Sequence, residues 1–103
     1  MQVIAELTVV PIGVGTSLSE YVAVCEEILD EAGLTVQLHA NGTNIEGEWD
    51  TVFSAIRRCH EKIHTLGAPR IHTSIKVGTR IDREQTMADK VQSVESKLSA
   101  TDK

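Results

Sequence analysis

The order in which hydrophobic patterns follow one another is what most constrains the fold of this chain. Alternating patterns typical of strands and patterns with the period of about 3.6 typical of helices succeed each other along almost its whole length. In chain order the predicted elements are a strand over 3–10, a helix from Ser19 to Gly33, strands over 35–39 and 43–47, a helix over 49–66, a strand from Arg70, and a helix with the stripe Met87, Val91, Val94 and Leu98. Without the last helix, this is the β-α-β-β-α-β order of a ferredoxin-like domain.

Such an order predicts an α+β fold in which a four-stranded antiparallel sheet carries the two crossover helices on one face. Gly33 and Gly67 stand where a left-handed residue would end each of these helices, and Ser19 offers a side-chain oxygen to cap the start of the first. The pair Asn41-Gly42 predicts a tight hairpin between the two middle strands.

The length of 103 residues allows a single domain, which we expect over 1–98 with a frayed tail over 99–103. Its core is thin, because the chain has one Trp, one Tyr and one Phe, and a chain this short buries only about 60% of its unfolded surface. A thin core favours assembly, so we expect a homo-oligomer, either a dimer or a tetramer.

Charge and composition exclude several classes of partner. The net charge of -5 opposes the phosphate backbone, so nucleic acid is not an expected partner. No apolar run approaches the roughly 20 residues of a membrane span, and no leader of the secretory type opens the chain. Cys25 and Cys59 both fall at apolar helical positions, where reduced thiols pack well. These features favour a cytoplasmic protein that holds no metal.

The face of the sheet away from the helices has no internal cover, so its residues decide the question of function. If the apolar sides of the strands point toward the helices, polar side chains of both charge signs occupy the other side. They are Glu6, Thr8, Gln37, His39, Asn44, Glu46, His72, Ser74 and Lys76.

The segment His60-Glu61-Lys62-Ile63-His64 matches the H-E-x-x-H pattern of zinc hydrolases. In that pattern two imidazoles on one helix bind zinc and the glutamate acts as general base. Here the apolar stripe centres near Cys59 and Ile63, which puts His60 on its flank and His64 farther round. A solvated helix face is therefore the favoured interpretation, and a zinc hydrolase is a remote alternative.

The segment from Pro11 to Ser17 joins a strand to a helix and contains Gly13 and Gly15. Glycine amides beside a helix start can hold an anion, so Gly13, Gly15 and Ser17 form a candidate anion-binding loop. The alternative is a plain connector, since the sequence has no Walker lysine there. Near the end of the last strand Lys76, Arg80 and Arg83 give a weak signal of further positive charge.

The segment Thr43-Asn44-Ile45-Glu46-Gly47-Glu48-Trp49 is more informative. It places Asn44 and Glu46 outward on a central strand and puts an indole at the start of the next helix. A carboxylate can accept from an exocyclic amine, an amide can donate, and an indole can stack, which suits a flat heteroaromatic ligand. The alternative is that the acidic residues complement the helix start while Trp49 packs as core.

Several blocks of the sequence together resemble the thiamine-binding protein family. They are Ile4-Ala5-Glu6, Pro11-Ile12-Gly13, Ser19-Glu20-Tyr21-Val22, Gly42-Thr43-Asn44-Ile45-Glu46-Gly47-Glu48-Trp49-Asp50, Gly67-Ala68-Pro69-Arg70 and Lys90-Val91 with the helix that follows. The resemblance covers nearly the whole chain. It implies a small ferredoxin-like protein that forms dimers or tetramers and binds thiamine or its hydroxymethylpyrimidine moiety.

The resemblance implies binding without catalysis and without a further cofactor, in a carrier, buffer or sensor. On matching positions it marks Thr43 and Glu46 as candidate ligand contacts, with Asn44 and Trp49 as neighbours. The predicted strand register adds Glu6, Thr8, Ser74 and Lys76, in pockets that form between subunits. The other class of function left open is an oligomeric interaction or regulatory module without a small ligand.

Overall fold

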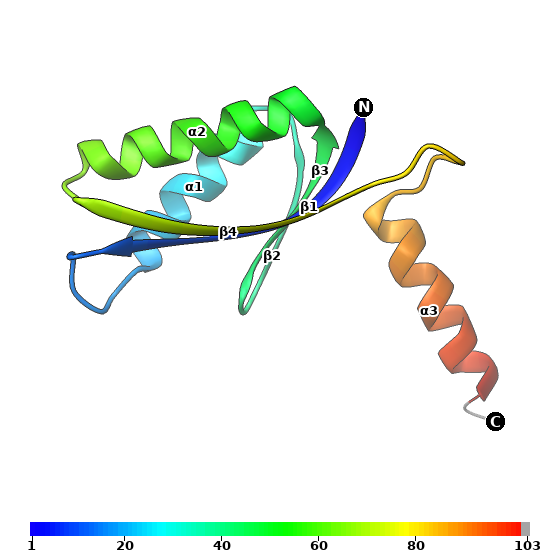
Figure 1. Cartoon of the computed structure of the whole chain (residues 1–103). Helices are drawn as coiled ribbons and strands as arrows, with labels where there is room; N and C mark the ends of the chain where they lie inside the picture. The colour runs from blue at the N-terminus through cyan, green and yellow to red at the C-terminus, as the bar shows by residue number, and fades with distance from the viewer. Residues whose placement is uncertain (102–103) are drawn as a thin grey trace.

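The computed structural model describes residues 1–101 of the chain. Its elements are β1 (Gln2–Ile12), α1 (Ser19–Glu31), β2 (Thr35–His39), β3 (Gly42–Glu48), α2 (Trp49–Thr65), β4 (Arg70–Thr79) and α3 (Met87–Thr101). The predicted β-α-β-β-α-β order with an additional helix at the end is confirmed, and Figure 1 shows the elements in place.

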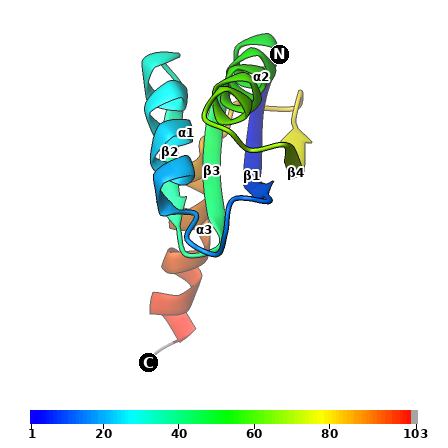
Figure 2. The ribbon, with the colours of Figure 1, turned by 90° about the vertical axis from the view of Figure 1, so that its left-hand side faces the viewer.

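The four strands form one sheet in the order β2-β3-β1-β4, and every neighbouring pair is antiparallel. Both α1 and α2 lie on the same face of this sheet, as Figure 2 shows. The odd-numbered residues Val3, Ala5 and Leu7 of β1 point into the space between the sheet and these helices and are buried. The prediction of which β1 residues face the helices is therefore confirmed. Residues paired across strands share a face, so the same assignment extends to β2, β3 and β4.

The core consists of apolar side chains from this inner face and from the facing stripes of α1 and α2. Its members are Val3, Leu7, Cys25, Leu29, Leu34, Ile45, Val52, Ala55, Ile56, Cys59, Ile63 and Ala68. Glycine at position 47 is part of this packing, because a Cβ there would lie 2.3 Å from Cδ2 of Leu34. A side chain at position 47 would therefore push Leu34 out of its place.

The two cysteines are buried and unoxidised where α1 and α2 meet, as the apolar pattern predicts. Sγ of Cys59 lies 3.8 Å from the backbone oxygen of Cys25. A hydrogen bond with Cys59 and burial both raise the pKa of Cys25 above its ordinary value. Cys25 therefore stays a neutral thiol at physiological pH.

Both crossover helices end as predicted. Gly33 has a φ of +80° and Gly67 a φ of +109°, the left-handed conformation that glycine adopts without steric cost. The predicted cap at Ser19 is wrong, because Ser19 is already the first helical residue. The amides of Tyr21 and Val22 donate to the backbone oxygen of Leu18, and no side chain caps this helix.

Three other boundaries differ from the prediction. Strand β1 continues through Pro11 to Ile12, because this end of β1 pairs with β4 alone and the missing amide of proline is not needed there. The hairpin between β2 and β3 turns at residues 40–41, since His39 pairs directly with Gly42. Helix α3 runs to Thr101, into the expected tail, and residues 102–103 lie outside the described part.

Helix α3 lies on the side of the sheet opposite α1 and α2 and extends away from it (Figures 1 and 2). The radius of gyration is 15.8 Å, whereas a compact chain of this length has about 13 Å. Within residues 1–101, no helix has the length and hydropathy of a membrane span.

Candidate functional site

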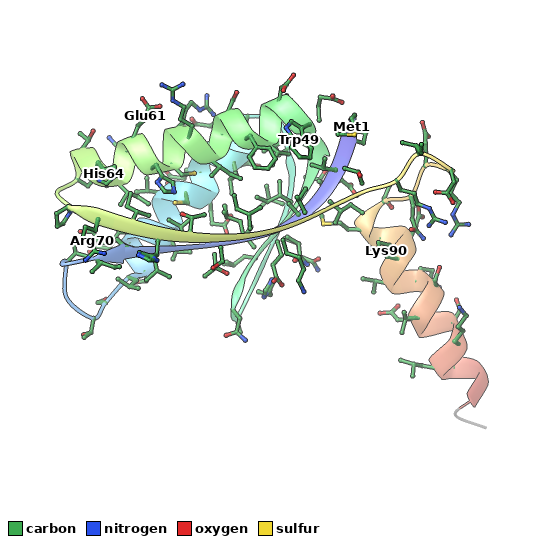
Figure 3. The ribbon with its side chains drawn as sticks, viewed as in Figure 1. Met1, Trp49, Glu61, His64, Arg70 and Lys90 are labelled. Carbon is green, nitrogen blue, oxygen red and sulfur yellow. The ribbon has the colours of Figure 1, made fainter. Side chains whose placement is uncertain are left out.

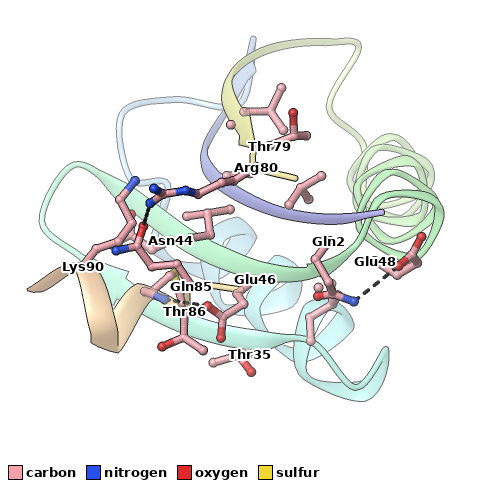
Figure 4. A pocket seen from close by; sticks show the side chains of 18 of the residues that line it. Gln2, Thr35, Asn44, Glu46, Glu48, Thr79, Arg80, Gln85, Thr86 and Lys90 are labelled. Atoms are coloured by element: carbon pink, nitrogen blue, oxygen red, sulfur yellow. Dashed lines mark hydrogen bonds between the residues drawn. The ribbon is translucent and has the colours of Figure 1, made fainter. Parts of the chain in front are cut away.

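A cavity of about 1530 Å³ lies at the end of the sheet where β1 begins. It is lined by the open face of the sheet, by the segment that leads into α3, and also by residues 32–35 and Thr51 from the helix side. Its floor is the end of the sheet where β1 begins and β4 ends. The wall opposite the sheet is formed by residues 79–80 and 83–87 and by the second turn of α3. Figure 4 shows the side chains that line it.

The floor of the cavity consists of two neighbouring rows that cross all four strands. The first row is Thr35, Glu46, Ile4 and Gly78, and the second is Gln37, Asn44, Glu6 and Lys76. Residues paired directly across antiparallel strands point to the same face, so each row presents its side chains together. Because Gly78 has no side chain, no side chain covers the Ile4 side chain from the β4 side in the first row. The floor thus combines an apolar centre with carboxylate and amide groups.

The wall is fixed to the floor through Glu46. The backbone amide of Met87, the first residue of α3, donates to Oε2 of Glu46 at 2.6 Å. The start of α3 is further ordered by Thr86 and Asp89, since the amide of each donates to the side chain of the other at 3.0 Å. This reciprocal arrangement is a capping box, and it lowers the pKa of Asp89. Glu46 therefore anchors α3, and its Oε1 faces the cavity without a hydrogen bond to a described residue.

Glu6 on the floor and Glu48, which also lines the cavity, have partners as well. Oε2 of Glu6 lies 3.4 Å from Nε2 of His39, close enough for an ion pair when the imidazole is protonated. Glu48 accepts from the amino-terminal ammonium group and, at 3.3 Å, from Nε2 of Gln2. On the wall, Arg80 donates to both carboxylate oxygens of Asp82 and, at 2.8 Å, to Oε1 of Gln85. The Arg80 guanidinium lowers the pKa of Asp82 to about 2.

The structure brings four of the predicted contact residues into this cavity, namely Glu6, Asn44, Glu46 and Lys76. Thr8 and Ser74 pair with each other on the same open face but lie outside the cavity. Sequence patterns pointed weakly to Arg80 and Arg83, and they missed Ile4, Thr86 and Met87. Ile4 could have been identified from its position in β1, because it precedes Glu6 by two residues and so lies on the same face of the strand.

Thr43 lies on the opposite face of β3 from Glu46 and does not line the cavity. It lies on the helix face of β3, is 6% exposed, and pairs with Leu7 across the strands. Its hydroxyl donates to Oε1 of Glu26 on α1 at 2.7 Å, while Oε2 of Glu26 is buried without a partner among the described residues. Thr43 therefore acts in packing α1 against β3.

Trp49 also lies apart from the cavity. It is the first residue of α2, on the helix side of the sheet (Figure 3), and its amide donates to the backbone oxygen of Met1. The indole packs against the ring of Phe53 with a centroid separation of 4.8 Å. The side chain is 36% exposed and does not belong to the core.

The candidate anion loop is at the other end of the molecule from α3 (Figure 1). Gly13 and Gly15 both have positive φ, and a Cβ on Gly13 would lie 3.0 Å from Cγ of Pro69. The loop thus packs against the turn before β4. Gly13, Gly15 and Ser17 do not line the cavity under α3, and anion binding there stays a prediction.

The two histidines of the H-E-x-x-H segment have local partners. His60 is half-buried, more than the pattern suggested, and its Nε2 lies 2.5 Å from Oγ1 of Thr73 on β4. Nδ1 of His64 donates to the backbone oxygen of Ala68 at 2.8 Å, and Glu61 points to solvent (Figure 3). Among residues 1–101, no group of three or more metal-ligating side chains is present. The geometry gives zinc no third protein ligand at this segment.

The chain is similar to one protein family and to several known proteins. A family model described as thiamine-binding protein matches residues 5–95. A UPF0045 protein of Synechocystis sp. is 59% identical over 98 residues, which cover 95% of this chain and 81% of that protein. The crystal structure of a hypothetical protein from Methanocaldococcus jannaschii matches with a TM-score of 0.85 at 31% identity, over 91% of this chain and 96% of that one.

A candidate thiamine biosynthesis/salvage protein from Thermotoga maritima has the same fold. Its crystal structure matches with a TM-score of 0.78 over 91% of this chain and 99% of that one. The sequence identity is 18%, so this likeness establishes the shared architecture alone.

Proposed function

Because this chain belongs to the thiamine-binding protein family, we propose that it binds thiamine or its hydroxymethylpyrimidine part in the cavity beneath α3. The observation that carries the proposal is the floor of that cavity. There a carboxylate and an amide, Glu46 and Asn44, flank the apolar side chain of Ile4. Ligand pockets typically combine an apolar surface with a few placed polar groups.

The chemistry of an aminopyrimidine fits these residues. Its exocyclic amine can donate to Oε1 of Glu46, the oxygen that does not hold α3. The side-chain amide of Asn44 donates to Oε1 of Gln37 at 3.4 Å. It can give up this long hydrogen bond and donate to a ring nitrogen of the ligand instead. Ile4 on the floor and Met87 on the wall are both half-buried and offer apolar contact to the flat ring.

We further propose that a second copy of the chain closes the cavity. The space exceeds the roughly 300–1,000 Å³ of a typical small-molecule pocket, so one copy leaves the ligand open to solvent. Val91, Val94 and Leu98 on α3 are 51%, 58% and 60% exposed. With Met87 they are spaced by four, three and four residues, the spacing of a seam between two helices. Such a seam would bring a second copy to the cavity.

The role we assign is binding without turnover, as a carrier, buffer or sensor in the cytoplasm. A carrier needs recognition groups and a closable pocket, and the floor and α3 supply these. Asn44, Glu46 and Ile4 would hold the ligand, and none of them needs to change covalently.

The test is a thermal-shift panel with thiamine and hydroxymethylpyrimidine, together with a native mass measurement. A ligand that binds the folded state alone raises the melting temperature by mass action, by an amount that grows with ligand concentration. We expect such a rise and an oligomer that retains the ligand. No rise with either compound at concentrations up to the millimolar range would contradict the proposal.

The exposed stripe on α3 also favours a second candidate function, an interaction module that holds no small ligand. This candidate predicts assembly without any thermal shift, and it predicts that Val94→Asp breaks the assembly while Glu46→Gln has no effect. The thermal-shift panel therefore separates the two candidates.

A further inference from the structure

We propose that α3 links ligand binding to assembly, so that a ligand in the cavity tightens the association of two copies and the second copy tightens the binding of the ligand. This inference rests on the proposed function and adds the regulation of that same site. Two features of α3 carry it. Part of its apolar stripe is also part of the cavity wall, and Glu46 on the cavity floor holds its first residue.

The cavity wall and the apolar stripe of α3 have two residues in common. Met87 and Val91 both line the cavity, and both belong to the stripe that continues with Val94 and Leu98. Successive residues of an α-helix are about 100° apart around its axis, so these four side chains lie within a sector of about 60°. A ligand in the cavity and a second helix packed along the stripe therefore contact the same face of α3.

The stripe is long enough for both partners. Met87 is half-buried, whereas the exposed fraction rises along the helix from Val91 to Leu98. Val94 and Leu98 do not line the cavity. The ligand would thus cover the beginning of the stripe, and the second copy would cover the part that lies beyond the cavity.

The attachment of α3 to the sheet runs through the group that the ligand would contact. Oε2 of Glu46 accepts from the backbone amide of Met87 at 2.6 Å, and Oε1 is left for the ligand. Beyond its second turn α3 extends away from the sheet, as Figures 1 and 2 show. The first turn of α3 therefore sets the direction in which the whole stripe is presented to a second copy.

Two physical effects give the link a positive sign. A ligand that donates to Oε1 of Glu46 and packs against Met87 holds this side chain and the first turn of α3 in one position. Less conformational freedom is then lost when the second copy binds. The second copy in turn excludes water from the cavity, which strengthens the hydrogen bond between the ligand and the carboxylate. By thermodynamic linkage, the factor that the ligand adds to assembly equals the factor that assembly adds to ligand affinity.

The experiment measures assembly and ligand affinity separately on the full chain. Sedimentation equilibrium with and without thiamine gives the dissociation constant of the assembly, and we expect thiamine to lower it at least about 5-fold. Titration calorimetry at protein concentrations above and below that constant should show a change in thiamine affinity by the same factor.

Val94→Asp is the informative variant, because Val94 belongs to the stripe but does not line the cavity. It should lower the mass of the assembly and bind thiamine at least about 5-fold more weakly than the assembled wild type. The matched control is Ser93→Asp, which adds the same charge at an exposed position about 130° around the helix from the stripe. This control should assemble and bind thiamine like the wild type.

Each other outcome overturns the inference in a distinguishable way. Assembly that does not respond to thiamine, together with wild-type affinity in Val94→Asp, would show that the two binding events are independent, and thiamine binding would stand. Weaker assembly in the presence of thiamine would show that the ligand and the second copy compete for the stripe. A chain that binds thiamine but stays single at every concentration would remove the second copy and leave the ligand. If neither thiamine nor hydroxymethylpyrimidine binds, the proposed function fails together with the inference.

Discussion

The two faces of the single four-stranded sheet differ in how completely their side chains are used. On the helix face, Ile45 and its neighbours are buried, and the hydroxyl of Thr43 is satisfied by Glu26. On the open face, polar side chains surround a cavity, and Lys76 has no partner among the described residues. The helix face is thus largely buried core, whereas the open face keeps polar side chains that make no hydrogen bond or ion pair within the described residues.

Along β3, residues that pack in the core alternate with residues that line the cavity. Thr43 and Ile45 face the helices, whereas Asn44 and Glu46 face the cavity. Substitutions one position apart should therefore affect different properties.

The largest effect is expected for Ile45→Ala on the helix face. The side chain is completely buried, so its truncation leaves a cavity and should lower the free energy of unfolding by about 2–5 kcal/mol. Urea denaturation measures this loss. The control is Asn44→Ala on the open face, which should change stability by about 0.5 kcal/mol or less. Similar losses in the two variants would break the distinction between the faces.

Thr43→Val should come next. It removes the donor to Oε1 of Glu26, whose other oxygen already lacks a partner, and should lower the free energy of unfolding by about 1.5–3 kcal/mol. The same substitution at Thr8, whose hydroxyl donates to the backbone of Asn41 on the exposed side, should cost clearly less. Ligand affinity, measured by titration below the melting transition, should not change in Thr43→Val. A loss of affinity there would return Thr43 to the binding site.

Glu46→Gln should show the reverse pattern. The amide oxygen of glutamine can still accept from Met87, so stability should hold, but the charge-assisted bond to the aminopyrimidine is lost. We expect thiamine affinity to fall about 10- to 100-fold in titration calorimetry. Glu48→Gln removes the same charge at the next position of this face and is the control. An equal loss in both variants would indicate a general effect of charge.

The smallest effect concerns the start of α3. Hydrogen bonds from the amide and then the hydroxyl of Thr86 lower the pKa of Asp89. Because the folded-state pKa lies below the ordinary value near 3.9, this contact stabilises the first turn of α3 above that pH. The stabilisation is lost as the pH falls through the lowered pKa. A carboxyl titration by NMR should show a midpoint below 3.9 for Asp89, and Thr86→Ala should raise it.

Much of the fold could be predicted from the sequence, because local patterns decide it. Alternation in β1 and β3 fixes which residues face the helices, and Gly33 and Gly67 end the crossover helices where expected. The same alternation places Thr43 with Ile45 on the inner face. The resemblance to a family motif marks Thr43 as a ligand contact, whereas the alternation along β3 places it on the face away from the cavity.

The position of α3 could not be predicted in this way. It depends on the hydrogen bond between Met87 and Glu46, which are 41 positions apart in the chain. No periodic pattern relates two such residues, so the wall of the cavity and the contribution of Lys90 to it appear only in three dimensions. The apolar stripe from Met87 to Leu98 predicted a helix but not its direction.

The outward course of α3 affects how the size of this protein must be measured. A radius of gyration of 15.8 Å corresponds to roughly twice the volume of a compact sphere-like chain of this length. On a sizing column, which separates by hydrodynamic volume, a lone 11.2 kDa chain would elute early and resemble a pair. Light scattering or sedimentation, which report mass independently of shape, will be needed to count the copies.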